Sequence, residues 1–140
     1  MDLLEKNFVI KNIRAFSRNL RNEISKTSRY YFYDNGIRNA VINNFNGISL
    51  RDDIGQLWEN YLVIERIKKQ MYDEIYTNNY FWRTYQQKEI DWVEERDGKL
   101  FGFGFKWGLK QGKAPNEWLE GYPNSTFTVI NPSNYLEEFL

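Results

Sequence analysis

The pattern of hydrophobic and polar positions predicts one long helix near the middle of the chain. Between residues 53 and 72, apolar side chains such as Ile54 and Leu57 recur at the three- and four-residue spacing of one helical face. Further apolar residues widen this face almost all round, so we expect the helix to be mostly buried. Asp52 and Asp53 stand at its start, where a cap and the positive end of the helix dipole favour acids.

Short runs rich in aromatic and β-branched residues predict strands on both sides of this helix. Arg96-Asp97-Gly98 has the composition of a tight hairpin turn between two of them. The expected strands begin at residue 8 and cover 30–33, 80–85, 89–94, 99–107 and 126–130, and short helices are expected at 2–6, after residue 36 and at 116–120. The order from residue 53 is then α-β-β-β-α-β, so we expect an α/β fold with a mixed sheet.

The composition fits a single folded domain, residues 1–140, with 41% hydrophobic and 18% aromatic residues. The absence of cysteine and histidine changes the possible chemistry most. It excludes disulfides, imidazole or thiolate metal ligands, and Ser-His-Asp triads within this chain. Any catalysis would have to use carboxylates, Lys, Tyr, Ser or Thr, together with an oxygen-binding divalent ion.

Basic residues concentrate near the N-terminus, although the formal net charge of the chain is zero. Between residues 6 and 29 the only acid is Glu23, and Phe8 and Phe16 lie among the cations. Such a segment could contact phosphates and stack bases, but it could equally be a solvated surface or a docking face for an acidic partner. The candidate nucleic-acid contacts are Lys11, Arg14, Arg18, Arg21, Lys26 and Arg29.

Two other possible features are excluded by the residues present. Residues 108–114 resemble a phosphate-binding loop, but Trp107 stands where its first glycine belongs and Ala114 replaces the Ser/Thr that would bind Mg²⁺. We therefore expect no ATP binding by this chain. The N-terminus is not a signal peptide and no apolar run is long enough to span a bilayer, which favours a cytoplasmic protein without a membrane partner.

The predicted hairpin carries the candidate chemistry. Strict alternation along a strand would place Glu89 and Asp91 on one face, and Ile90 and Trp92 on the other. On the next strand, Gly104 and Lys106 would share one face, and Phe103, Phe105 and Trp107 the other. Asp91 and Lys106 could then meet on one side of the sheet, and Glu59 from the long helix could approach them. The simpler interpretation is a cross-strand ion pair, with Glu59 facing solvent.

Several blocks resemble the C-terminal domain, itself of unknown function, of a family of prokaryotic AAA-type ATPases. The resemblance spans roughly residues 3–136. The matching blocks, in order, are Phe16-Ser17-Arg18-Asn19-Leu20-Arg21, Tyr31-Phe32-Tyr33-Asp34, Leu57-Trp58-Glu59-Asn60, Tyr80-Phe81-Trp82-Arg83-Thr84, Glu89-Ile90-Asp91-Trp92-Val93 and Phe105-Lys106-Trp107. The resemblance implies a restriction-endonuclease-like core at 51–140, preceded by a basic αβ extension at 1–50. In that family the domain follows an ATPase domain and a winged-helix segment.

The resemblance also implies roles for individual residues. The nuclease pattern is an acid followed by Glu-x-Lys on the adjoining strand, which resembles Asp91 as the central metal ligand and Lys106 as the lysine that activates the attacking water. Glu59 matches the helix glutamate that assists metal binding. Gly104 falls where the glutamate of Glu-x-Lys belongs, so one ligand for Mg²⁺ or Mn²⁺ is missing, unless Glu89 or Glu94 takes its role.

The incomplete set favours a vestigial site in Asp91, Lys106 and Glu59, with no cofactor. We therefore expect a non-catalytic, nuclease-like module of an AAA-type ATPase that recognises nucleic acid or a protein partner, the ATPase domain included. The enzymatic alternative is a metal-dependent nuclease that uses Glu59, Asp91 and Lys106, with Mg²⁺ or Mn²⁺ bound by Asp91 and Glu59. A third alternative is a structural or oligomerisation domain.

Overall fold

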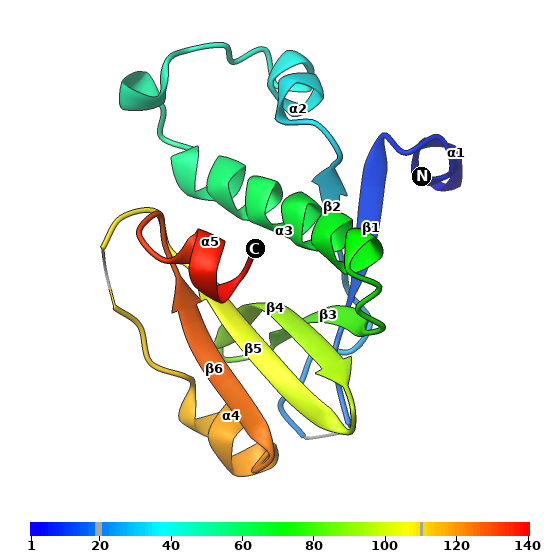
Figure 1. Cartoon of the computed structure of the whole chain (residues 1–140), viewed down its shortest axis with the longest axis vertical. Helices are drawn as coiled ribbons and strands as arrows, with labels where there is room; N and C mark the ends of the chain where they lie inside the picture. Colours follow the sequence, from blue (N-terminus) through cyan, green and yellow to red (C-terminus); the bar gives the residue numbers. More distant parts are fainter. Residues whose placement is uncertain (19–20, 110) are drawn as a thin grey trace.

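A computed structural model describes residues 1–18, 21–109 and 111–140, which form an α/β fold around one mixed six-stranded sheet. The strand order is β2-β1-β3-β4-β5-β6 (Figure 1). The strands are β1 (Ile10–Ala15), β2 (Ser28–Phe32), β3 (Asn78–Arg83), β4 (Glu89–Arg96), β5 (Lys99–Phe105) and β6 (Ser125–Ile130). The α-helices are α1 (Asp2–Lys6), α2 (Asn35–Val41), α3 (Ile54–Tyr72), α4 (Asn116–Gly121) and α5 (Tyr135–Glu138), and η1 (Ile48–Leu50) is a 3-10 turn.

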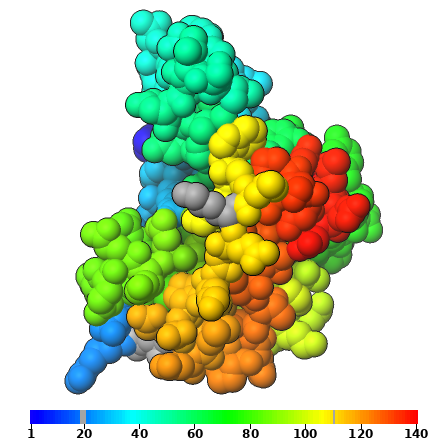
Figure 2. Space-filling view, turned by 90° about the vertical axis from the view of Figure 1, so that its left-hand side faces the viewer, coloured from blue at the N-terminus to red at the C-terminus, as the bar shows by residue number. Residues whose placement is uncertain are grey.

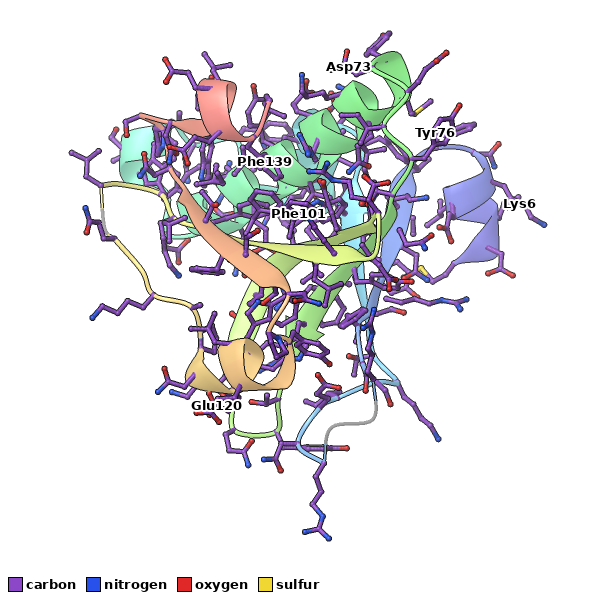
Figure 3. The ribbon with its side chains drawn as sticks, turned by 60° about the horizontal axis from the view of Figure 1, so that its bottom comes forward. Lys6, Asp73, Tyr76, Phe101, Glu120 and Phe139 are labelled. Carbon is purple, nitrogen blue, oxygen red and sulfur yellow. The ribbon has the colours of Figure 1, made fainter. Side chains whose placement is uncertain are left out.

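Two hydrophobic cores lie on the two faces of the sheet. On one face, the buried side of α3 packs against Trp92 and Phe103, and the C-terminal Phe139 projects into this layer (Figure 3). On the other face, Trp118 of α4 packs against Ile90 and other strand residues. The central strands are therefore covered on both sides, which explains their near-continuous apolar sequence.

The expected α/β class with a mixed sheet is confirmed. The N-terminal residues are part of the same sheet, because β1 runs parallel to β3 with Arg14 opposite Tyr80. The strand expected to begin at residue 8 begins at Ile10, and the strand expected to end at residue 107 ends at Phe105. The hairpin of β4 and β5 closes through Asp97 and Gly98, both of which have positive φ. In the described residues no helix is both long and apolar enough to cross a membrane.

The start of α3 is stabilised by arginines, which differs from the expected acidic cap. Asp53 occupies the N-cap position but makes no side-chain cap hydrogen bond. Its carboxylate instead accepts hydrogen bonds from Arg51, at 2.8 Å, and from Arg38 of α2, at 2.7 Å. These bonds fasten the segment of α2 and η1 to the first turn of α3.

An asparagine from α3 closes part of the sheet edge formed by β2. The Asn60 side chain accepts from the Phe32 N–H at 2.8 Å and donates to the Phe32 carbonyl at 2.7 Å. Asn60 is 5% exposed, so both bonds are largely shielded from water. The side-chain amide thus makes the two hydrogen bonds that a neighbouring strand would make at this residue.

Asn60→Ala is expected to lower the free energy of unfolding by about 1–3 kcal/mol, because it leaves buried backbone groups of Phe32 without partners. Urea unfolding measures the change, and hydrogen exchange should show faster exchange of the Phe32 amide. Asn7→Ala serves as the control, since Asn7 bonds only an exposed carbonyl, that of Leu3. An equal loss in both variants would contradict this explanation.

Candidate functional site

Strand β4 contains a bulge at Asp91 and Trp92, where the pairing with β3 shifts in register. Two residues of β4 there face the single residue Phe81 of β3. Ile90 consequently packs in the core on the α4 side, whereas Trp92 packs on the α3 side. The predicted alternation, which put Ile90 and Trp92 on the same face, is wrong because of this bulge.

The bulge directs the Asp91 carboxylate to the α3 side of the sheet, where three acids surround Arg29. The Arg29 guanidinium lies 3.2 Å from Glu59, 2.8 Å from Glu89 and 3.6 Å from Asp91. Asp91 also accepts the Phe105 backbone N–H at 2.7 Å. We call Glu59, Glu89 and Asp91 the carboxylate cluster. It brings together residues from α3 and β4, and Arg29 of β2 lies at its centre.

Burial and mutual repulsion dominate the electrostatics of this cluster. Burial, and then the charge of Asp91, raise the pKa of Glu59, while Arg29 and a hydrogen bond from the Tyr31 hydroxyl at 2.7 Å act in the opposite direction. Burial likewise raises the pKa of Asp91 against the effects of the Phe105 N–H and Arg29. Burial opposes the charge on Arg29, yet Tyr31, Glu59 and Glu89 outweigh it and raise its pKa. Arg29 is therefore a permanent cation between carboxyl groups.

Arg29 takes the place that a metal ion would need between Glu59 and Asp91. Its N–H groups are donors to the same carboxylate oxygens that would bind the ion. Over the described ranges, no group of three or more acids is arranged to hold a metal ion. The two acids that the resemblance assigns to metal binding are thus neighbours, but a guanidinium separates them.

The position of the missing glutamate is filled by an aromatic ring. A Cβ atom at Gly104 would lie 2.9 Å from Cζ of Phe127, which is closer than such atoms approach. Lys106 follows the end of β5 and is exposed, and its backbone N–H donates to the carbonyl of Ile130. In the parts of the chain that the structure describes, no ion pair joins Lys106 to Asp91, so the cross-strand pair is not formed. Lys106 acts on Asp91 only through its charge, which opposes the effect of burial on the Asp91 pKa.

Gly104→Glu, which restores the glutamate of the nuclease pattern, is expected to destabilise the fold by about 1–3 kcal/mol, because the new side chain must displace Phe127. Thermal unfolding measures this loss. Gly55→Glu is the matched control, since a Cβ at Gly55 meets nothing within 4 Å. We further expect no metal-dependent cleavage by Gly104→Glu, since Arg29 still occupies the cluster. Cleavage by this variant alone would contradict the role given to Arg29.

The candidate nucleic-acid contacts do not form one surface. Arg29 lies in the carboxylate cluster, and Arg18 pairs with Glu95 at 2.7 Å. Lys11 lines a different groove, beside Phe8 and Tyr33. The remaining three, Arg14, Arg21 and Lys26, are exposed.

Sequence reasoning missed that Tyr31 belongs to this site and that Arg29 is held by acids. The available signal was the two-residue spacing of Arg29 and Tyr31 in an aromatic strand, which puts both side chains on one face. That face packs on α3, and both side chains bond Glu59.

The fold and the site define an α/β domain with a mixed sheet and an arginine-filled carboxylate cluster. The model of the family described as Domain of unknown function (DUF4143) matches residues 54–139, well over half of the chain. The chain belongs to this family. A second family, described as Domain of unknown function (DUF8612), matches residues 1–47. Comparisons with curated proteins and with solved structures give no match.

Proposed function

We propose that this chain is a non-catalytic, nuclease-like module of an AAA-type ATPase and that it recognises a protein partner. The observation that carries the proposal is Arg29, whose guanidinium contacts Glu59, Glu89 and Asp91. A Mg²⁺ ion needs near-octahedral oxygen ligands and retains several waters. The cluster offers neither free oxygens nor room for these waters while Arg29 is bound there. The restriction-endonuclease-like character of the core is part of this proposal.

Phe127 supports the non-catalytic assignment independently. Its ring lies against Gly104, so the fold has adapted to the lack of a side chain there. A recently lost carboxylate would leave a space, whereas this position is packed. The loss of the ligand and the insertion of Arg29 concern different strands, β5 and β2, and both remove metal-binding capacity.

A protein partner is favoured by the apolar surface. The segment 35–50, which holds α2 and η1, projects from the body of the molecule (Figure 2). Its large hydrophobic side chains are between 43% and 77% exposed. They are Ile37, Val41, Ile42, Phe45, Ile48 and Leu50. Grouped exposed apolar side chains of this kind are typical of protein interaction sites.

The nuclease alternative is tested by incubating the intact chain with DNA and RNA in Mg²⁺ or Mn²⁺. We expect no cleavage above that of Asp91→Ala, which controls for contaminating nucleases. Cleavage by the wild type that Asp91→Ala abolishes would overturn the proposal. It would show that Glu59 and Asp91 bind a metal ion despite Arg29.

Nucleic-acid recognition without cleavage is the second candidate, because Arg14, Arg21 and Lys26 are exposed cations. It predicts binding whose affinity falls steeply with salt, as counterions are released. Filter binding over a salt series, with the triple alanine variant as control, measures it. Salt-independent or absent binding removes this candidate. Light scattering separates the remaining alternative, an oligomerisation domain, which predicts stable self-association without any ligand.

A further inference from the structure

Strand β2 is an edge strand whose outward backbone groups are only partly used. Asn60 bonds both backbone groups of Phe32, so these groups point away from β1. In an antiparallel pair, alternate residues direct their N–H and C=O groups the same way. The backbone groups of Ser28 and Tyr30 therefore also point outward, beyond the sheet. Tyr30 is 41% exposed, so water reaches this edge.

The opposite edge of the sheet is better closed. At β6, the Asn134 side chain donates to the carbonyl of Val129 at 2.9 Å. The N–H of Ser125 donates to the carbonyl of Tyr122 at 2.9 Å. Unpaired edges invite another strand, and proteins usually protect them. The contrast singles out Ser28–Tyr30 as the accessible strand edge.

A groove runs beside this edge. It has a volume of about 270 Å³ and lies between β2 and the first half of α3, with Gln56 and Glu59 on the helix side. Arg38 of α2 and Arg29 of β2 also line it. Two guanidinium groups thus face one carboxylate. Burial also raises the pKa of that carboxylate, Glu59, which weakens its negative charge.

We propose that the edge of β2 at Ser28–Tyr30 binds an extended segment of a partner protein, which adds to the sheet as a further strand and places an acidic side chain toward Arg38 and Arg29. This inference rests on the proposed protein-recognition function and gives it a binding site. Backbone hydrogen bonds would supply affinity, and the groove would supply side-chain specificity. The added strand ends before Phe32, because Asn60 occupies that position.

The geometry favours a single peptide over a second copy of this chain. A symmetric antiparallel pairing of two β2 strands centred on Tyr30 would need the edge of Phe32, which Asn60 already occupies. The helices that wall the groove leave the space of one narrow chain beside β2. An extended segment with an acid fits this space and its charge.

The experiment selects linear peptides from a random display library on the intact chain and measures the binding of the enriched synthetic peptide. Tyr30→Pro removes an outward N–H without breaking a bond to β1, and proline is tolerated at edge strands. Tyr30→Ala controls for the side chain. We expect enriched peptides to contain an acid, and Tyr30→Pro to bind them about tenfold more weakly than Tyr30→Ala, as for the loss of one hydrogen bond.

A second measurement keeps the test valid if Tyr30→Pro fails to fold. Peptides N-methylated at successive residues are titrated against the wild-type chain, and binding should fall only at alternate residues, the period of a strand. Equal effects at all residues, no dependence on the acid, or equal affinity of the Pro and Ala variants would overturn the inference. Light scattering that shows a dimer lost in Tyr30→Pro would assign the edge to a second copy and overturn it too. Because cleavage is assayed separately, failure here leaves the non-catalytic assignment standing.

Discussion

Glu94→Gln is expected to lower the free energy of unfolding by about 3–5 kcal/mol, because it leaves a buried arginine without its counter-ion. Glu94 is 0% exposed and accepts hydrogen bonds from Arg66 at 2.6 and 2.9 Å. Gln70 and Trp92 donate to the same carboxylate, at 2.8 and 2.9 Å. Arg66 additionally donates to the carbonyl of Phe139 at 2.6 Å, so this network joins α3, β4 and the C-terminal segment.

Urea unfolding measures this change, with Glu95→Gln as the matched control. Glu95 is the next residue on β4, but it is 28% exposed and its partner Arg18 is 55% exposed. An ion pair of that kind contributes about 0–1 kcal/mol. The double variant Arg66→Met/Glu94→Leu should be more stable than Glu94→Gln, because no unpaired charge remains buried. Equal losses for Glu94→Gln and Glu95→Gln would show that the buried network contributes little.

The same network makes the fold sensitive to acid. Burial would raise the pKa of Glu94, but the hydrogen bonds and charge of Arg66 outweigh it and hold the pKa below its ordinary value. The folded state therefore binds fewer protons at this site than the unfolded chain does. Its stabilisation is complete above the ordinary glutamate pKa of about 4.3 and is lost as pH falls below it.

The elements that sequence reasoning predicted well are those defined by local patterns. The long helix follows from apolar residues three and four apart, and the β4–β5 hairpin from Asp97-Gly98 at its turn. The parallel pairing of β1 with β3 joins Arg14 to Tyr80, a contact that no local pattern defines. The short helix α5 was also missed, because its packing depends on the core and not on its own four residues.

The candidate site shows the same limit. The lack of a carboxylate at Gly104 is visible in the sequence, and the proximity of Glu59 to Asp91 was anticipated from the resemblance. The bulge that turns Asp91 toward α3 depends on the register between β3 and β4, which alternation within one strand cannot reveal. Arg29 lies 30 residues before Glu59 in the chain, and only the fold brings them together.

Arg29→Met is expected to destabilise the fold by about 1.5–3 kcal/mol at neutral pH, since it removes charge-assisted hydrogen bonds from partly buried acids. Methionine retains apolar contact with the Phe81 ring, over which the guanidinium now lies at 4.5 Å. Arg83→Met is the matched control, because Arg83 is 41% exposed and 4.0 Å from Glu89 at the rim of the cluster. We expect a change of at most about 0.5 kcal/mol in the control.

The pH dependence and the metal response of Arg29→Met test whether the guanidinium stands in for an ion. Burial already raises the pKa of Glu59 and Asp91, so the folded state takes up protons there more readily than the unfolded chain. Without Arg29 this difference grows, and the variant should regain stability as pH falls from about 8 toward the ordinary acid pKa of about 4. Mn²⁺ should likewise raise the Tm of Arg29→Met but not that of the wild type, because a ligand that binds only the folded state stabilises it. An Arg29→Met variant that responds to neither protons nor Mn²⁺ would mean that Arg29 does not hold the carboxylates apart, and the metal-like role would be lost.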